Sequence, residues 1–142
     1  MKEDKDLEQL KKRLLLGILV MVVILVPFTC LFLRKTMNKS DVLKKYNHKK
    51  TFMVLVTNSN EKDKCNSLKK TLKNKDISYV EYNLDKTYDK DRVLPKFGVS
   101  YESINVPMLV YVYKGKTVIR VMNVYDESVL DDFLSECSKY KR

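Results

Sequence analysis

Cysteine, histidine and arginine are scarce in this chain of 142 residues. Its three cysteines are Cys30, Cys65 and Cys137, and its single histidine is His48. None of them stands at the spacing of metal ligands, so we expect no metal site, and we predict no cofactor. A disulfide between Cys65 and Cys137 stays open at this stage, because only the distance between them decides it.

Arginine is scarce although the chain is strongly basic. Lys and Arg outnumber Asp and Glu by 28 to 18, which gives a formal net charge of +10. Only five of the 28 are arginine, the better reader of bases and phosphates. The lysines are scattered over expected loops and helix faces. We interpret them as a solvated surface that faces acidic lipid head groups, and we predict no nucleic-acid binding.

One long run without charge sets the first part of the chain apart. Residues 14–33 are 20 residues without a charged side chain, between Arg13 and Arg34. A helix of that length spans the hydrocarbon core of a bilayer, about 30 Å. A cleaved signal peptide would have a shorter apolar part and small residues at a cut site, and a lipidation site at Cys30 would need small residues before it. We therefore expect a tail at 1–13 and one retained transmembrane helix at 14–33, which contacts the lipid bilayer.

The charges that flank this helix and its position in the chain predict opposite orientations in the membrane. The tail carries five Lys and Arg against four acids, whereas residues 34–50 carry seven Lys and Arg against one acid. Basic flanks favour the cytoplasmic side, which would place the C-terminal part inside the cell. A single anchor with a short basic tail usually leaves the folded domain outside. On that layout we expect the soluble domain on the extracytoplasmic side.

Residues 34–50 read as a basic linker, and a soluble domain follows at 51–142. Apolar residues recur there with the periods of strands and of amphipathic helices. They predict strands at 51–57, 77–84, 107–113 and 117–122, and helices at 61–75, around 93–97 and from 126 to 137.

These elements follow the order β-α-β-α-β-β-α. A helix between the first two strands implies that they pair in parallel, whereas the tight turn at 114–116 makes the last two strands antiparallel. We therefore predict an α/β fold of three layers, in which a mixed four-stranded sheet is covered by helices and preceded by the transmembrane helix.

This order, with a proline opening the third strand, resembles the thioredoxin-like fold. In layout the chain is similar to bacterial membrane-anchored members such as the bacteriocin-accessory proteins. The resemblance covers residues 51–137 and implies a cis peptide bond at Val106–Pro107. Asn123 stands where the family usually has glycine, and Asn tolerates positive φ better than most residues. The segments that carry the likeness are 77–85, 94–99, 106–107, 113–116 and 129–134.

In that family a Cys-x-x-Cys motif opens the helix after the first strand and faces the cis-proline across a groove. The matching window here runs from Lys62 to Cys65 and is degenerate: Cys65 matches the second, resolving cysteine, and Lys62 stands in the nucleophile's place. A shift by one residue would make Cys65 a nucleophile like that of monothiol members. Lys62, Lys64 and the helix start would then lower the pKa of Cys65. The expected groove consists of Lys62, Lys64, Val106 and Pro107, with backbone groups open to an extended partner segment.

Two functions of different class follow from this resemblance. The first is a membrane-anchored, non-catalytic thioredoxin-like module that binds an extended segment of a secretion or envelope protein at the groove of Cys65 and Pro107. The second is a thiol–disulfide oxidoreductase with Cys65 as its catalytic residue, in which glutathione or a partner protein supplies the other sulfur. We favour the first, because two-step thiol exchange needs a second thiol.

Overall fold

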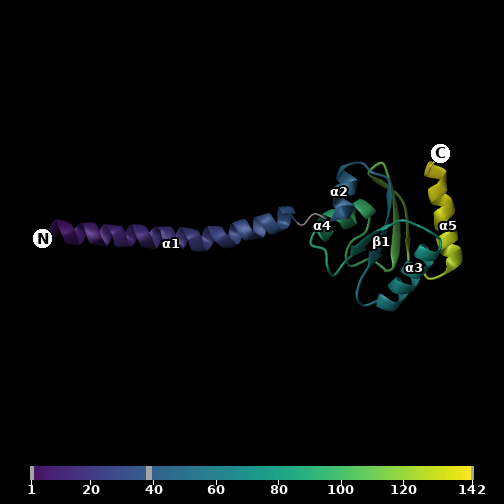
Figure 1. The fold of residues 1–142 in the computed structure, drawn as a ribbon, viewed down its shortest axis with the longest axis horizontal. Helices are drawn as coiled ribbons and strands as arrows, with labels where there is room; N and C mark the ends of the chain where they lie inside the picture. Colours follow the sequence, from purple (N-terminus) through teal and green to yellow (C-terminus); the bar gives the residue numbers. More distant parts are fainter. Residues whose placement is uncertain (1, 38–39, 142) are drawn as a thin grey trace. The chain divides into compact units, whose positions relative to one another are not determined.

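The computed structural model describes residues 2–37 and 40–141, with the side chains of 7–30 and 40–141. The chain divides into two compact units, Met1–Asn38 and Lys39–Arg142, and each is described by itself. The first unit contains one helix, α1 (Lys2–Met37). The second contains all the strands and the remaining helices (Figure 1).

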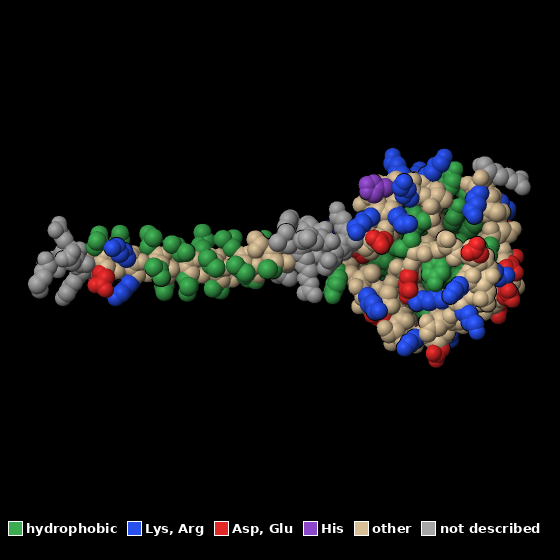
Figure 2. Space-filling model, viewed as in Figure 1, with side chains coloured by type: hydrophobic (Ala, Val, Ile, Leu, Met, Phe, Trp, Pro, Cys, Tyr) green, Lys and Arg blue, Asp and Glu red, His purple; other side chains and the backbone are tan. Residues whose placement is uncertain are grey.

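Helix α1 is long and apolar enough to cross a membrane. Its stretch Leu7–Cys30 has 24 residues and contains an 18-residue window of mean hydropathy 2.5. At about 1.5 Å per residue the stretch extends about 36 Å. Apolar side chains surround the middle of the helix, and charged side chains of both signs lie near its N-terminal end (Figure 2). The stretch expected at 14–33 lies within this helix, which continues beyond it at both ends.

The second unit is built on a mixed four-stranded sheet of order β2-β1-β3-β4. Strand β1 (Phe52–Thr57) pairs in parallel with β2 (Val80–Asn83) and antiparallel with β3 (Met108–Tyr113). Strand β4 (Lys116–Met122) pairs antiparallel with β3 at the other edge. This topology confirms the predicted α/β, thioredoxin-like architecture.

Helices cover both faces of the sheet, which gives three layers (Figure 1). Side chains alternate along β1, so Val54 packs on one face and Leu55 on the other, as the strand period of two requires. The face of Val54 is covered by α2 (Asp41–Asn47), α4 (Lys90–Val93) and the 3-10 turn η1 (Leu94–Phe97). The face of Leu55 is covered by α3 (Lys62–Asn74) and α5 (Glu127–Ser138), which continues into η2 (Lys139–Lys141).

The expected linker at 34–50 is wrong in its second half. Helix α2 is part of the folded unit, because Val42, Leu43 and Tyr46 are buried in the core on the Val54 face. The Tyr46 ring packs edge-on against Phe52 at 6.2 Å between ring centroids. The folded domain therefore begins about ten residues before the first strand.

Two turns agree with the sequence. The two-residue turn between β3 and β4 consists of Lys114 and Gly115, both with positive φ (50° and 75°), as the tight hairpin turn requires. Asn123, after β4, also has positive φ (54°), as expected for an Asn in a glycine position.

Candidate functional site

The candidate site lies where the parallel strands β1 and β2 end and α3 begins. The Asn58 side-chain oxygen accepts the backbone N–H of Glu61 at 2.9 Å, and this bond satisfies one of the free amides at the helix start. The backbone N–H of Cys65 donates to the Glu61 carbonyl at 2.9 Å as an i to i−4 bond. Cys65 is thus the fourth residue of α3, on the same buried face as Leu68 and Leu72.

Cys65 is buried, with 2% of its surface exposed. Burial raises the pKa of its thiol, since a thiolate loses hydration there. A backbone hydrogen bond from Asn58 and the charge of Lys69 act in the opposite direction, while the carboxylates of Glu61 and Glu81 add to the rise. The net pKa of Cys65 lies above its ordinary value.

The expectation that Lys62 and Lys64 lower the pKa of Cys65 is therefore wrong. Lys64 pairs with a different group, since its ammonium lies 2.7 Å from a Glu61 carboxylate oxygen. Lys62 is exposed on the first turn of α3. Neither lysine is among the main groups that shift the pKa of the Cys65 thiol. Lys69 does lower this pKa, but burial outweighs its effect.

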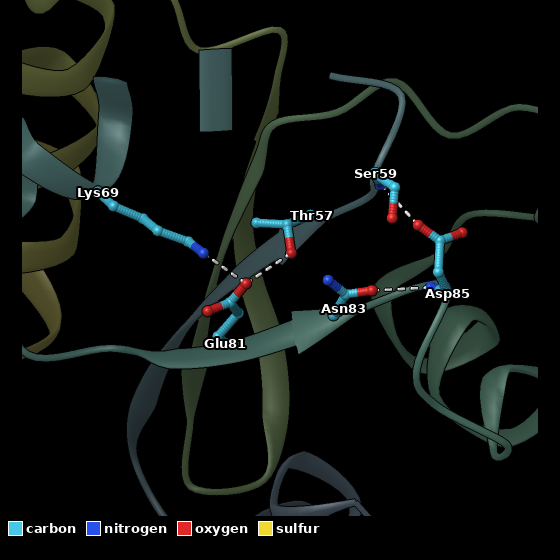
Figure 3. Close-up of polar contacts among 6 residues, drawn as sticks. All are labelled: Thr57, Ser59, Lys69, Glu81, Asn83 and Asp85. Carbon is cyan, nitrogen blue, oxygen red and sulfur yellow. Dashed lines mark hydrogen bonds and ion pairs between the residues drawn. The ribbon is translucent and has the colours of Figure 1, made fainter. Parts of the chain in front are cut away.

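A carboxylate holds α3 to the two parallel strands. Glu81 on β2 accepts the Thr57 hydroxyl of β1 at 2.9 Å and the Lys69 ammonium of α3 at 2.7 Å on the same oxygen (Figure 3). Burial alone would raise the pKa of Glu81, but these two hydrogen bonds outweigh it and hold the pKa below its ordinary value. The three elements that frame Cys65 are thereby tied together.

The loop between β1 and α3 is fixed by a second carboxylate. The Ser59 backbone N–H donates to an Asp85 carboxylate oxygen at 2.6 Å, and the Asp85 N–H donates to the side-chain oxygen of Asn83 at 2.9 Å (Figure 3). The hydrogen bonds from Ser59 lower the pKa of Asp85. The loop that leads into α3 therefore has a defined position before any partner binds.

The Val106–Pro107 peptide is cis, as the resemblance implies. Val106 and Pro107 are both buried, and their carbonyls are already engaged. The Tyr125 hydroxyl donates to the Val106 carbonyl at 3.2 Å, and the Val124 N–H donates to the Pro107 carbonyl at 3.2 Å. The two carbonyls that we expected to be open to a partner strand are thus engaged from within the chain.

Tyr125 connects the two sides of the predicted groove, and sequence reasoning missed it. Its ring lies under the Lys64 ammonium, 4.8 Å from the ring centroid, while its hydroxyl reaches Val106 and Asn123. About half of the residue is exposed (51%). Through Tyr125 the structure brings Lys64 and Val106 together, two of the four residues expected in the groove.

Cys137 lies at the other end of the domain, so a Cys65–Cys137 disulfide is excluded. Cys137 lines a cavity together with Asp76–Val80, the segment that follows the C-terminal end of α3. Cys65 stands nine residues before the end of that helix, about 14 Å along its axis. Disulfide-bonded residues have Cα atoms less than about 7 Å apart. Both thiols are free. Among the side chains of residues 7–30 and 40–141, the structure brings no three metal-binding groups together.

Comparison with known proteins gives a likeness to solved structures alone. No protein-family model matches the chain, and no curated protein matches its sequence. Among solved structures, the chain is similar to that of Trxlp from Edwardsiella tarda EIB202, with 22% identity and a TM-score of 0.39. The match covers 68% of this chain and 94% of that protein. The assignment of the fold follows from the strand order and pairing described above.

Proposed function

We propose that this chain is a membrane-anchored, thioredoxin-like binding module that holds an extended segment of a partner protein at the corner of Cys65 and Pro107, without thiol chemistry. The burial of Cys65 carries the proposal. Thiol–disulfide exchange proceeds through a thiolate, and the raised pKa of Cys65 disfavours that form at neutral pH.

The rest of the corner supports binding. Glu81 and Asp85 hold α3 and its leading loop in place, and a preformed surface loses less conformational entropy when a partner binds. At the first turn of α3 the exposed side chains of Lys62 and Asp63 lie beside the Lys64–Glu61 ion pair, so this turn is polar without a net charge. The half-exposed ring of Tyr125 adds apolar contact area.

The apolar helix α1 favours a partner protein that is also located at the membrane. The apolar side chains of Leu7–Cys30 are exposed along their helix, and immersion in a bilayer removes that surface from water. We place the folded unit on the extracytoplasmic side, with an envelope or secretion protein as its partner.

A single-cysteine oxidoreductase is the second candidate. The backbone of Asn58 and the charge of Lys69 both favour the thiolate of Cys65, although burial outweighs them. A partner that opened this corner would remove part of the burial and let these two groups act. The two candidates therefore differ in whether partner binding needs the sulfur atom.

Photo-crosslinking in cells separates the two. A photoreactive amino acid at Lys62, which is exposed beside Cys65, should form an adduct with one partner protein, and a matched probe at Asp132 on α5 should not. The same adduct should form equally in the Cys65→Ser background. A photo-adduct that disappears with Cys65→Ser, or a light-independent mixed disulfide of Cys65 that a reductant releases, contradicts the binding module and supports the enzyme.

Alkylation kinetics give an independent readout that needs no partner. In a Cys30→Ser, Cys137→Ala variant, the rate of Cys65 alkylation should rise with a midpoint above the ordinary thiol value of 9.0. A midpoint below pH 7 would establish an activated thiol and overturn the proposal.

A further inference from the structure

A second hollow opens at the opposite end of the sheet from Cys65. Strand β2 begins at Val80, which pairs with Val54, so Phe52 and Met53 of β1 extend beyond it. The preceding residues 76–79 line a cavity of about 540 Å³ instead of continuing the strand. That volume lies within the usual range of small-molecule sites, about 300–1,000 Å³. Strand β2 is therefore shorter than the strand expected at 77–84. Residues 77–79, which were expected to belong to it, form a wall of the cavity.

The walls of this cavity are apolar with a basic bias. Phe52, Tyr79 and Leu134 contribute apolar side chains from β1, the segment before β2, and α5. Two lysines, Lys45 and Lys141, line it against a single carboxylate, Asp76. An apolar body with one acidic group complements such walls.

Tyr111 supplies the observation that points to a ligand. It lines this cavity from β3 and is 3% exposed, yet its hydroxyl has no hydrogen-bond partner among the atoms that the structure describes. An unpaired buried hydroxyl destabilises the fold, because it has lost its hydrogen bonds to water without gaining others. The other two buried tyrosines differ in this respect. The Tyr82 hydroxyl donates to Asp89 at 2.9 Å, and the Tyr46 hydroxyl donates to the Lys96 carbonyl at 3.1 Å.

We propose that this cavity binds a small amphipathic acid, whose apolar body packs between Tyr79 and Leu134 and one of whose oxygen atoms accepts a hydrogen bond from the Tyr111 hydroxyl. The lysines of the wall compensate the charge of the acid. This site is independent of the partner surface at Cys65, since it lies at the other ends of β1 and α3. The protein then carries two separate binding sites on one sheet.

Cys137 is a built-in reporter for this cavity, because it lines the cavity and is buried. The test uses full-length protein in nanodiscs that carries Cys30→Ser and Cys65→Ser, so that Cys137 is its single thiol. Phenylacetate is the probe, and phenylacetamide is its uncharged counterpart. We expect phenylacetate to slow N-ethylmaleimide labelling of Cys137, measured by mass spectrometry, at least five-fold and saturably. Phenylacetamide should need about a ten-fold higher concentration than phenylacetate to give the same protection of Cys137.

Two substitutions test the named contacts. Tyr111→Phe should weaken protection by phenylacetate about five- to ten-fold, the loss of one hydrogen bond, while leaving the unliganded fold at least as stable. Lys45→Gln should weaken protection by the acid and leave that by the amide unchanged. In a matched variant with Cys65 as the single thiol, phenylacetate should leave the labelling rate unchanged.

The outcomes that overturn the proposal are equally specific. The first is that phenylacetate does not slow the labelling of Cys137 saturably. The second is that phenylacetate and phenylacetamide protect Cys137 equally. The third is that neither Tyr111→Phe nor Lys45→Gln changes the protection. Equal slowing of Cys65 and Cys137 would show general stabilisation of the fold and would also overturn it.

Discussion

The backbone N–H of Ser40 donates to a carboxylate oxygen of Asp89 at 2.9 Å, although the two residues are 49 positions apart. The Ser40 hydroxyl donates to the same oxygen at 2.8 Å, and the Tyr82 hydroxyl donates to the other oxygen at 2.9 Å. Ser40 also caps α2, because its hydroxyl accepts the Leu43 N–H at 3.2 Å. Asp89 is 6% exposed. One buried carboxylate thus holds the start of α2, the first helix of the folded unit, to the sheet.

Replacing Asp89 should destabilise the folded unit strongly. Asp89→Ala leaves the donors of Ser40 and Tyr82 without an acceptor in a buried place, which costs about 2–4 kcal/mol of unfolding free energy. Urea unfolding of the unit from Lys39 onward measures the loss. Asp132→Ala, on the exposed side of α5, is the control and should change stability by less than about 0.5 kcal/mol. Equal effects of the two substitutions would contradict the role assigned to Asp89.

The sequence predicts the central strands and the order of the elements well, because a short apolar run bounded by turn residues is a local property. The strands expected at 51–57 and 107–113 are Phe52–Thr57 and Met108–Tyr113. The role of α2 could not be predicted in the same way. Its apolar residues Val42, Leu43 and Tyr46 stand in a Lys-rich segment, and the group that anchors it, Asp89, comes from a distant part of the chain.

Only the position of the candidate site was predictable. The polar loop and helix start identify Cys65, and the X-Pro pair identifies Val106–Pro107. The direction in which the pKa of Cys65 shifts depends on how deeply tertiary packing buries the thiol, and this burial cannot be predicted from the local sequence. Tyr125 was missed for a related reason, since its contact with Val106 depends on two loops 19 residues apart that meet only in the fold.

The stability of the folded unit should depend on pH through Glu81. Its folded-state pKa is lowered, so its contribution is complete above the unfolded value, near 4.5, and is lost as pH falls through the lower folded value. The group is partly exposed, so Glu81→Gln should cost less than about 1 kcal/mol at pH 7. Urea midpoints between pH 7 and pH 3 should show that the difference from wild type shrinks as the pH falls below 4.5.

Lys69→Gln is the matched variant for this prediction. Lys69 acts through Glu81, because its ammonium donates to the same carboxylate oxygen at 2.7 Å as part of their ion pair. The loss that this substitution causes should therefore shrink over the same acidic range. A difference between wild type and Glu81→Gln that persists unchanged at pH 3 would contradict the assignment.

Two glycines with positive φ should differ in how well they tolerate alanine. At either position, a residue other than glycine loses about 1–2 kcal/mol of folding free energy because the backbone is in the left-handed region. At Gly115 a Cβ would also lie 2.9 Å from the Tyr46 carbonyl oxygen and from the Lys49 Cα, which are backbone atoms of α2 and the turn after it. At Gly98 the Cβ would meet the end of the Arg120 side chain, at 2.6 Å, and a side chain can turn away.

Gly115→Ala should therefore lower the unfolding free energy by about 2–4 kcal/mol, and Gly98→Ala by about 1–2 kcal/mol. The Gly115 N–H donates to the Lys50 carbonyl at 3.1 Å, so a shift of this turn would also disturb the contact between the β3–β4 hairpin and the segment after α2. Urea unfolding of both variants from Lys39 onward checks the order. A smaller loss at Gly115 than at Gly98 would mean that the hairpin turn can move away from α2 and that the close approach of their backbones is not required for the fold.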